Sequence, residues 1–263
     1  MAAVQALLSE IPLGTEKEIL QKMREVIQMT PICVCSTTNK KGLELFFKSM
    51  SLYLPNGVPI YLASPQKPRL SPAPLKWIPN TYKSFGEAYN ACMKEAFLDG
   101  HQEVIVANDD IVLDPTSYTL LLEDRKQLKA KNVKVGFLGA RTNMSSLHMN
   151  VRNRLTEDHW NGMQWASEQL IIQVPWVAPI FASVGIDGWP GFPPINWYSD
   201  NVACDDMAKD GYMHFISRSY VHHACSQTIG RSQADSAKNH ADAEPWLKAN
   251  RPHLHKLYFA VHS

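Results

Sequence analysis

The stretch Val104-Ile-Val-Ala-Asn-Asp-Asp110 decides the fold, because an apolar segment with the pattern of a strand runs directly into three polar residues. The residues before this strand form a helical pattern whose start is marked by Ser84 and Glu87, the two members of a capping box. After the strand, Asp114 and Pro115 suit the N-cap and the first position of another helix. A strand placed between two helices is the repeating unit of α/β folds.

The alternation of strands and helices continues on both sides of this unit. Residues 31–36 and 58–63 have the apolar composition of buried strands, with a helix between them that runs to about residue 52. Residues 133–140 predict a further strand, and the proline-rich residues 64–79 predict an irregular surface loop. This order predicts an α/β fold with a mixed, mainly parallel sheet flanked by helices.

The second half and the two ends of the chain are less regular. A capping box at Thr15 and Glu18 predicts a first helix over residues 15–29, and the polar stretch 231–239 is expected to be mobile. The remaining expected elements are a helix within 157–169, strands near 170–174, 176–184 and 212–216, a helix over 201–209 and a short helix at 244–248.

The composition is that of a single soluble domain. The 263 residues are 45% hydrophobic and 19% charged, and a net charge of +1 excludes a global field for attracting a polyanion. No apolar run is long enough for a membrane span, and the first residues lack the pattern of a signal peptide. The five cysteines include no Cys-x-x-Cys pair, which favours free thiols in a reducing compartment. We therefore expect a cytoplasmic protein.

The acidic run after the central strand is the first candidate site. Ligands of open α/β sheets bind at the carboxyl ends of the strands, where Asn108, Asp109 and Asp110 are expected. Carboxylate oxygens are the ligands that Mg²⁺ or Mn²⁺ prefers, usually together with substrate phosphates. Taken alone, the triplet fits a polar turn at the end of a strand better than a metal site.

Several segments of the first half resemble the family 2 glycosyltransferases of the GT-A fold. Residues 31–50 look like the opening strand, polar turn and helix of that family. Ser84-Phe-Gly-Glu-Ala-Tyr-Asn90 is similar to the segment ahead of its acidic motif, and Val104-Ile-Val-Ala-Asn-Asp-Asp110 resembles the metal motif itself. Residues 135–140 match the strand that follows.

Two later segments extend the resemblance. Trp197-Tyr-Ser-Asp200, with a helix that ends before Gly211, looks like the segment that carries the family's catalytic carboxylate. Tyr220-Val-His222-His223 resembles its late histidine segment, in which one histidine completes the metal and diphosphate site. Adjacent residues of a strand face opposite sides, so only one of the two can do so, and we favour His223 slightly.

The resemblance implies a GT-A-type, Rossmann-like domain over residues 1–263. Its donor half would span about 30–140, its acceptor half about 141–230 and its tail 231–263. It implies a metal-dependent, inverting transferase that moves a sugar from a nucleotide-sugar donor, with a UDP-sugar favoured, to a hydroxyl acceptor.

The resemblance also assigns roles to residues. Asp110 and one of His222 and His223 would hold Mn²⁺ or Mg²⁺, and Asp200 would be the general base, although an Asp here also suits a helix N-cap. The residues expected to contact the donor are Ser36, Thr37, Thr38, Asn39, Asn90, Asn108 and Asp109.

Some positions depart from the family pattern. The second strand ends at Ser64 without the acid that helps to hold the base, so the nucleotide stays open. Asp205 and Asp206 are expected to be surface acids of a solvated helix. Basic residues gather between Arg125 and Arg154, where most should be surface charges and some could bind phosphate.

Aromatic residues ahead of the expected base could stack on a sugar or pack the core of their loop; they are Trp189, Phe192, Trp197 and Tyr198. A glycan or a small molecule is favoured as the acceptor over a hydroxymethylated base in phage-type DNA. The alternatives are a nucleotidyltransferase and a non-catalytic nucleotide-sugar-binding domain. A nucleotidyltransferase would need a glycine-rich phosphate loop, and residues 36–42 contain one glycine.

Overall fold

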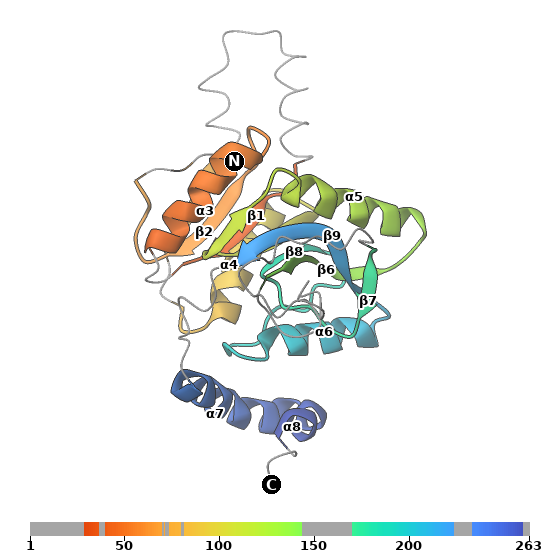
Figure 1. The fold of residues 1–263 in the computed structure, drawn as a ribbon. Helices are drawn as coiled ribbons and strands as arrows, with labels where there is room; N and C mark the ends of the chain where they lie inside the picture. The colour runs from red at the N-terminus through yellow and green to blue at the C-terminus, as the bar shows by residue number, and fades with distance from the viewer. Residues whose placement is uncertain are drawn as a thin grey trace.

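The computed structural model describes residues 29–36, 40–69, 71, 74–79, 82–143, 170–223 and 233–259. Within these residues the chain forms a nine-stranded mixed sheet with helices on both faces (Figure 1). The predicted fold class, α/β with a mixed sheet between helices, is confirmed. None of the helices in this part of the chain is long and apolar enough to cross a membrane.

The sheet has a parallel half and a half with antiparallel pairings. The parallel half contains β1 (Ile32–Cys35), β2 (Ile60–Ser64), β3 (Leu75–Pro79) and β4 (Glu103–Asn108). The other strands are β5 (Ile111–Leu113), β6 (Val135–Thr142), β7 (Ile172–Val174), β8 (Phe181–Gly185) and β9 (Met213–His223). The order is β3-β2-β1-β4-β8-β6-β9-β5, and β7 pairs with β9.

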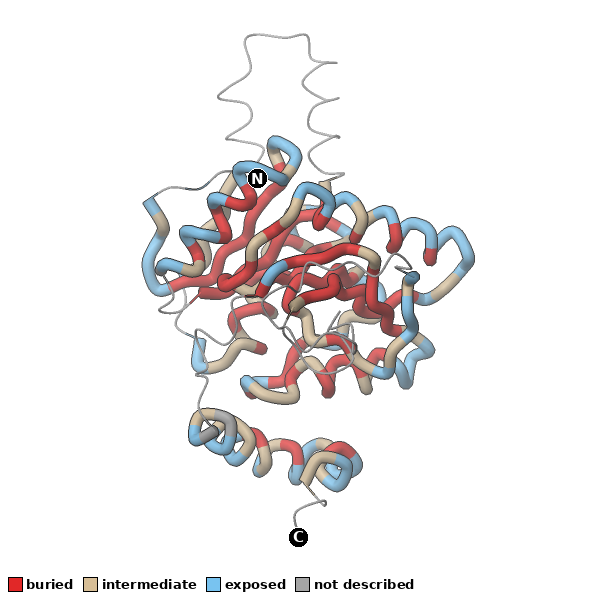
Figure 2. Tube along the Cα trace, in the orientation of Figure 1, coloured by how far each residue is buried: buried red, intermediate tan, exposed pale blue. Residues whose placement is uncertain are grey.

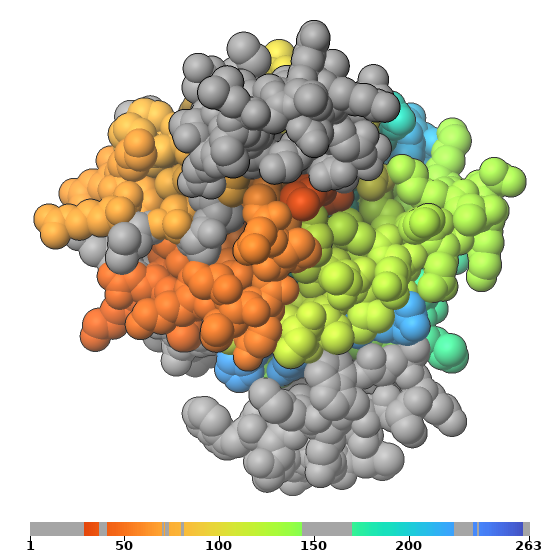
Figure 3. Space-filling model, turned by 90° about the horizontal axis from the view of Figure 1, so that it is seen from above, coloured from red at the N-terminus to blue at the C-terminus, as the bar shows by residue number. Residues whose placement is uncertain are grey.

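The helices divide the core into two layers. On one face lie α3 (Lys40–Tyr53) and α5 (Ser117–Ala130), which Figure 3 shows in orange and yellow-green. On the other lie α4 (Phe85–Leu98) and α6 (Ser199–Lys209). The central strands and the inner sides of these helices are buried, whereas β3 and β7 are partly exposed (Figure 2). Two further helices, α7 (Gln233–Asn250) and α8 (Pro252–Phe259), pack on α6 through a third apolar cluster.

Most elements of the first half form where the sequence predicts them. The capping box of α4 is present: the Glu87 backbone N–H donates to Ser84 Oγ at 3.2 Å, and the Ser84 N–H donates to Glu87 Oε2 at 3.1 Å. The predicted loop over 64–79 is wrong in part, because its end forms β3. That strand tolerates its flanking prolines because it is an edge strand, where a missing N–H costs no ladder bond.

The start of α5 is also corrected. The helix begins at Ser117 with Thr116 as N-cap, two residues after the predicted Asp114. Asp114 instead accepts a hydrogen bond from the Thr116 N–H at 2.6 Å, because the residues before it form the unpredicted strand β5. The stretch 231–239, expected to be mobile, is helical from Gln233 onward. The helices predicted over 15–29 and within 157–169 lie outside the described residues.

Candidate functional site

The carboxyl ends of β1 and β4 meet at one edge of the sheet. The two strands pair in parallel with Cys35 opposite Asn108, so the residues that follow them emerge together. Ser36, the first residue after β1, is buried, and its N–H donates to the Ala63 carbonyl of β2 at 2.9 Å. The other turn residues predicted to contact the donor, Thr37, Thr38 and Asn39, lie outside the described part of the chain.

Tyr89 of α4 holds the start of the polar run. Its hydroxyl donates to the Ala107 carbonyl at 3.0 Å and to Asn108 Oδ1 at 3.2 Å. Burial, with a smaller contribution from Asp109, raises the pKa of Tyr89 well above its ordinary value. Asn108 and Asp109 therefore face α4. Sequence reasoning missed Tyr89, although its position three residues before the buried Cys92 places it on the inner face of the helix.

Asp110 faces the opposite way, toward β9. The antiparallel pairing of β5 with β9 sets Ile111 opposite His223, and His223 Nε2 lies 3.1 Å from Asp110 Oδ1. Both side chains are almost fully buried, whereas His222 is exposed. Of the two candidate histidines, His223 is the one that contacts Asp110.

The Asp110 and His223 pair fits a divalent cation with two protein ligands. Two ligand atoms at about 2.1 Å from an ion and at right angles to each other lie about 3.0 Å apart, close to the observed separation. Among the described residues, no three His, Cys, Asp or Glu side chains gather into a larger metal site. An ion at this pair would therefore take its other ligands from phosphates and water, as Mg²⁺ and Mn²⁺ commonly do.

Asp200 lies in the first turn of α6. The N-cap of that helix is Tyr198, so the alternative interpretation of Asp200 as a helix cap is wrong. Its carboxylate accepts a hydrogen bond from the Asn201 N–H at 3.0 Å. Burial raises the pKa of Asp200 to about 6, against the smaller opposite effect of backbone hydrogen bonds. Such a carboxylate is ionised at neutral pH and is a better proton acceptor than an ordinary Asp.

The loop before α6 is bound to the start of α4. Asn196 Oδ1 accepts from the Phe85 N–H at 2.9 Å, at the start of α4. One turn later, Tyr89 contacts the end of β4. Asp200 follows Asn196 by four residues, so the first turn of α6 that contains it lies close to the start of α4.

Asn90 has a structural role in this arrangement. Its amide donates to the Phe192 carbonyl and accepts from the Phe192 N–H, both at 2.8 Å. Both ends of the amide are thus used to hold the loop, and a contact between Asn90 and a donor stays a prediction. The rings of Trp189 and Phe192 pack in the core against Phe137, as core packing of the loop requires.

The basic stretch is partly internal. Arg125 is buried, and its guanidinium donates to Glu103 at 2.7 Å and to the Gly136 carbonyl at 3.0 Å. Arg141 donates to the Ser217 carbonyl at 2.9 Å. These two arginines are therefore not surface charges. Arg154 lies outside the described residues.

Comparison with known proteins shows the fold. No known family and no curated sequence matches the chain. Among solved structures, a mannosyltransferase from Pyrobaculum calidifontis, in complex with GDP-Man and Mn²⁺, matches with a TM-score of 0.55 at 14% identity. That match covers 85% of this chain and 66% of the other.

A second match is TarS 1-349 of S. aureus in complex with UDP-GlcNAc, with a TM-score of 0.51 and 10% identity. It covers 80% of this chain and 61% of the other, so the chain spans about three fifths to two thirds of these proteins. At such low identity the likeness concerns the fold alone. The chain has the GT-A type of α/β fold.

Proposed function

We propose that the protein is a metal-dependent glycosyltransferase that uses a nucleotide-sugar donor. Two features support this proposal: a candidate pair of metal ligands and a candidate general base. One is the buried contact of 3.1 Å between Asp110 and His223. The other is Asp200, whose pKa of about 6 suits a general base. Structures of similar fold that contain GDP-Man with Mn²⁺, and UDP-GlcNAc, support the choice of donor class.

On the donor side, Asp110 and His223 would hold Mn²⁺ or Mg²⁺. When bound, the ion neutralises the charge that develops on the leaving nucleoside diphosphate. Ser36 would line the nucleotide pocket, since it follows β1, which pairs in parallel with β4. Asn108 and Asp109, held beside Tyr89, would form the wall of the site between α4 and the metal ligands. In this proposal the region 30–140 would supply most of the donor site.

On the acceptor side, Asp200 would take the proton of the attacking hydroxyl group. General base catalysis of this kind contributes about 10²- to 10⁴-fold to the rate. One base opposite a metal-bound leaving group favours a single displacement with inversion at the sugar carbon. A glycan or a small molecule is the favoured acceptor. The internal contacts of Arg125 and Arg141 weaken the case for modified DNA, since they remove two charges from any phosphate-binding surface.

A thermal-shift screen of nucleotide sugars, with and without Mn²⁺, tests the proposal. One donor should stabilise the protein only with metal, by about 2.7 kcal/mol at a donor concentration 100-fold above Kd. Asp110→Ala should abolish this stabilisation. Asp187→Ala is the matched control, because this exposed acid follows β8, which runs antiparallel to β4 and ends at the opposite edge. Stabilisation that persists in Asp110→Ala would refute the metal assignment.

The screen, together with an assay of donor hydrolysis and transfer, separates the alternatives. A nucleotidyltransferase would be stabilised by nucleoside triphosphates in place of nucleotide sugars. A non-catalytic binding domain would bind the donor but neither hydrolyse nor transfer it, whatever acceptor is offered.

A further inference from the structure

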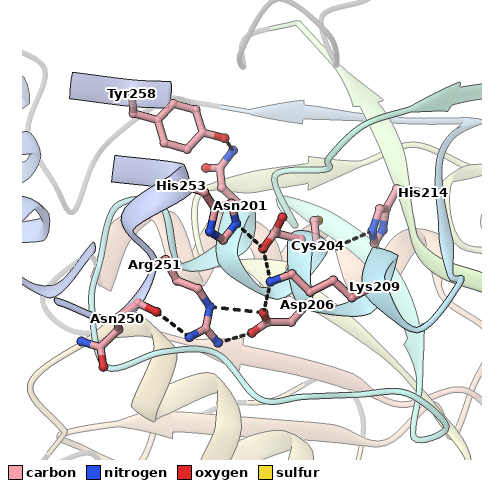
Figure 4. Close-up of polar contacts among 10 residues, drawn as sticks. Asn201, Cys204, Asp206, Lys209, His214, Asn250, Arg251, His253 and Tyr258 are labelled. Carbon is pink, nitrogen blue, oxygen red and sulfur yellow. Dashed lines mark hydrogen bonds and ion pairs between the residues drawn. The ribbon is translucent and has the colours of Figure 1, made fainter. Parts of the chain in front are cut away.

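The C-terminal helices α7 and α8 are in contact with the helix that carries Asp200. Figure 4 shows the polar part of this interface, where Asn201 of α6 points toward Tyr258 of α8. The Asn201 amide donates to the Tyr258 hydroxyl at 3.0 Å. The Tyr258 ring also stacks on Tyr198, with 4.8 Å between the ring centroids and 25° between the planes. Tyr258 therefore contacts two residues of the segment that surrounds Asp200.

These two residues determine where the Asp200 carboxylate lies. Asn201 follows Asp200, and its backbone N–H donates to the carboxylate. Tyr198 precedes Asp200 by two residues and has a φ of +66°, a left-handed conformation that is uncommon for a bulky side chain. The Tyr198 hydroxyl also lies 2.7 Å from Nδ1 of His240 in α7, and the Tyr198 ring packs against Phe259 of α8. Helices α7 and α8, together the C-terminal hairpin, thus support a strained backbone at the start of α6, the helix that carries Asp200.

Ion pairs connect the other end of α6 with the C-terminal helices. Arg251 pairs with Asp206 at 2.6 Å, and His253 with Asp205 at 2.9 Å (Figure 4). Lys209 joins both acids from within α6. The two acids are therefore partly exposed residues of this interface, and the expectation of a solvated helix face holds only in part. They lie five and six residues after Asp200, about 8 to 9 Å along the helix axis.

We propose that Tyr258 is a positioning residue for sugar transfer, which orients Asp200 through its contacts with Tyr198 and Asn201. This inference rests on the proposed function, because it assigns Asp200 the proton transfer. In this role Tyr258 acts through Tyr198 and Asn201 and is assigned no contact with donor or acceptor.

The charge environment of Asp200 agrees with this geometry. Among the described residues, the charge of Asp200 contributes to a raised pKa of three groups that are neutral at pH 7, namely Tyr198, Cys204 and Tyr258. Burial is the main cause that raises the pKa of Tyr258 to about 12, and Asp200 contributes. Removing the Tyr258 ring would admit water beside the carboxylate.

The test compares Tyr258→Ala, Tyr258→Phe and Arg251→Ala. Tyr258→Ala should lower kcat for transfer by about tenfold or more with the donor KM unchanged, because the base is displaced while the donor site stays intact. Tyr258→Phe keeps the ring stack and should recover much of this loss. Arg251→Ala is the matched control: it removes an ion pair of the same interface, so it should lower Tm but leave kcat unchanged.

A second readout does not depend on activity. In a carboxyl ¹³C NMR titration, with the Asp200 signal assigned by its loss in Asp200→Asn, the pKa of Asp200 should fall from about 6 toward 3.8 in Tyr258→Ala. It should stay unchanged in Arg251→Ala. Equal pKa values in the wild type and Tyr258→Ala would overturn the positioning role. Failure of the proposed function would look different: no transfer by the wild type, with the pKa difference intact.

Discussion

Replacing Asp200 with Asn should stabilise the protein while it abolishes transfer. Burial raises the pKa of Asp200 from 3.8 to about 6 in the folded state, so between these values the folded protein binds more protons than the unfolded chain. Its stability therefore falls as the pH rises through this window. Above pH 6 the ionised carboxylate is a net cost to the fold, and Asn removes that cost while its Oδ1 can still accept the Asn201 hydrogen bond.

The size of this stabilisation follows from the pKa shift of Asp200. About two pKa units correspond to about 3 kcal/mol at pH 8, an upper bound because the residue is not fully shielded from solvent. For a chain of this size, Tm should rise by roughly 4 to 10 °C. Near pH 4 the wild-type carboxyl is protonated in the folded state, so the two proteins should unfold at similar temperatures.

The assay is thermal unfolding of both proteins at pH 8 and pH 4, together with transfer rates at pH 8. Asp205→Asn provides a control of opposite sign on the same helix. Although burial raises the pKa of Asp205, its hydrogen bonds to Lys209 and His253 outweigh burial and hold the pKa below its ordinary value. Asp205→Asn should therefore lower Tm at pH 8. A Tm for Asp200→Asn at or below that of the wild type at pH 8 would refute the reasoning.

Two further predictions concern buried polar groups that hold the sheet. Burial lowers the pKa of His214, and the Phe137 N–H donates to its neutral Nδ1. The contribution of His214 to stability is therefore present above pH 6.5 and is lost as the pH falls. The urea midpoint should drop less between pH 8 and 5 in His214→Gln than in the wild type, and an equal drop would contradict this. Asp124 is fully buried and accepts two hydrogen bonds from the Arg218 guanidinium. Asp124→Ala should therefore lower the free energy of unfolding in urea by about 3 to 5 kcal/mol. The same substitution at its exposed neighbour, Glu123→Ala, should change it very little.

Local chemistry explains which elements could be predicted from the sequence. The capping box of Ser84 and Glu87 and the apolar run before Asn108 depend on residues close together in the chain, and both form as expected. β3 was missed because its prolines suggest a loop, and only its place at the sheet edge makes a strand possible. β5 was missed because a strand of three residues has too little periodicity of its own and depends on β9.

The candidate site also combines residues that the sequence indicates with residues that only the fold identifies. Asp110 and Asp200 stand out by position after a strand and at the start of a helix. The choice between His222 and His223 could not be made from the sequence, because it depends on the register of β9 against β5, which sets Ile111 opposite His223. The role of Tyr258 left no signal at all: its partners are more than fifty residues away, and its segment resembles an ordinary amphipathic tail.

The pairing of β5 with β9 also bears on how the protein folds. Asp110 and His223 are 113 residues apart in the chain (223 − 110), so their contact closes a very long loop. Contacts of such separation form late, after local helices and hairpins. On a ribosome, Asp110 would emerge well before its partner is made. The contact between Asp110 and His223 is therefore made only once β9 has entered the sheet. If the pair holds a metal as proposed, affinity for metal would report completion of the native topology.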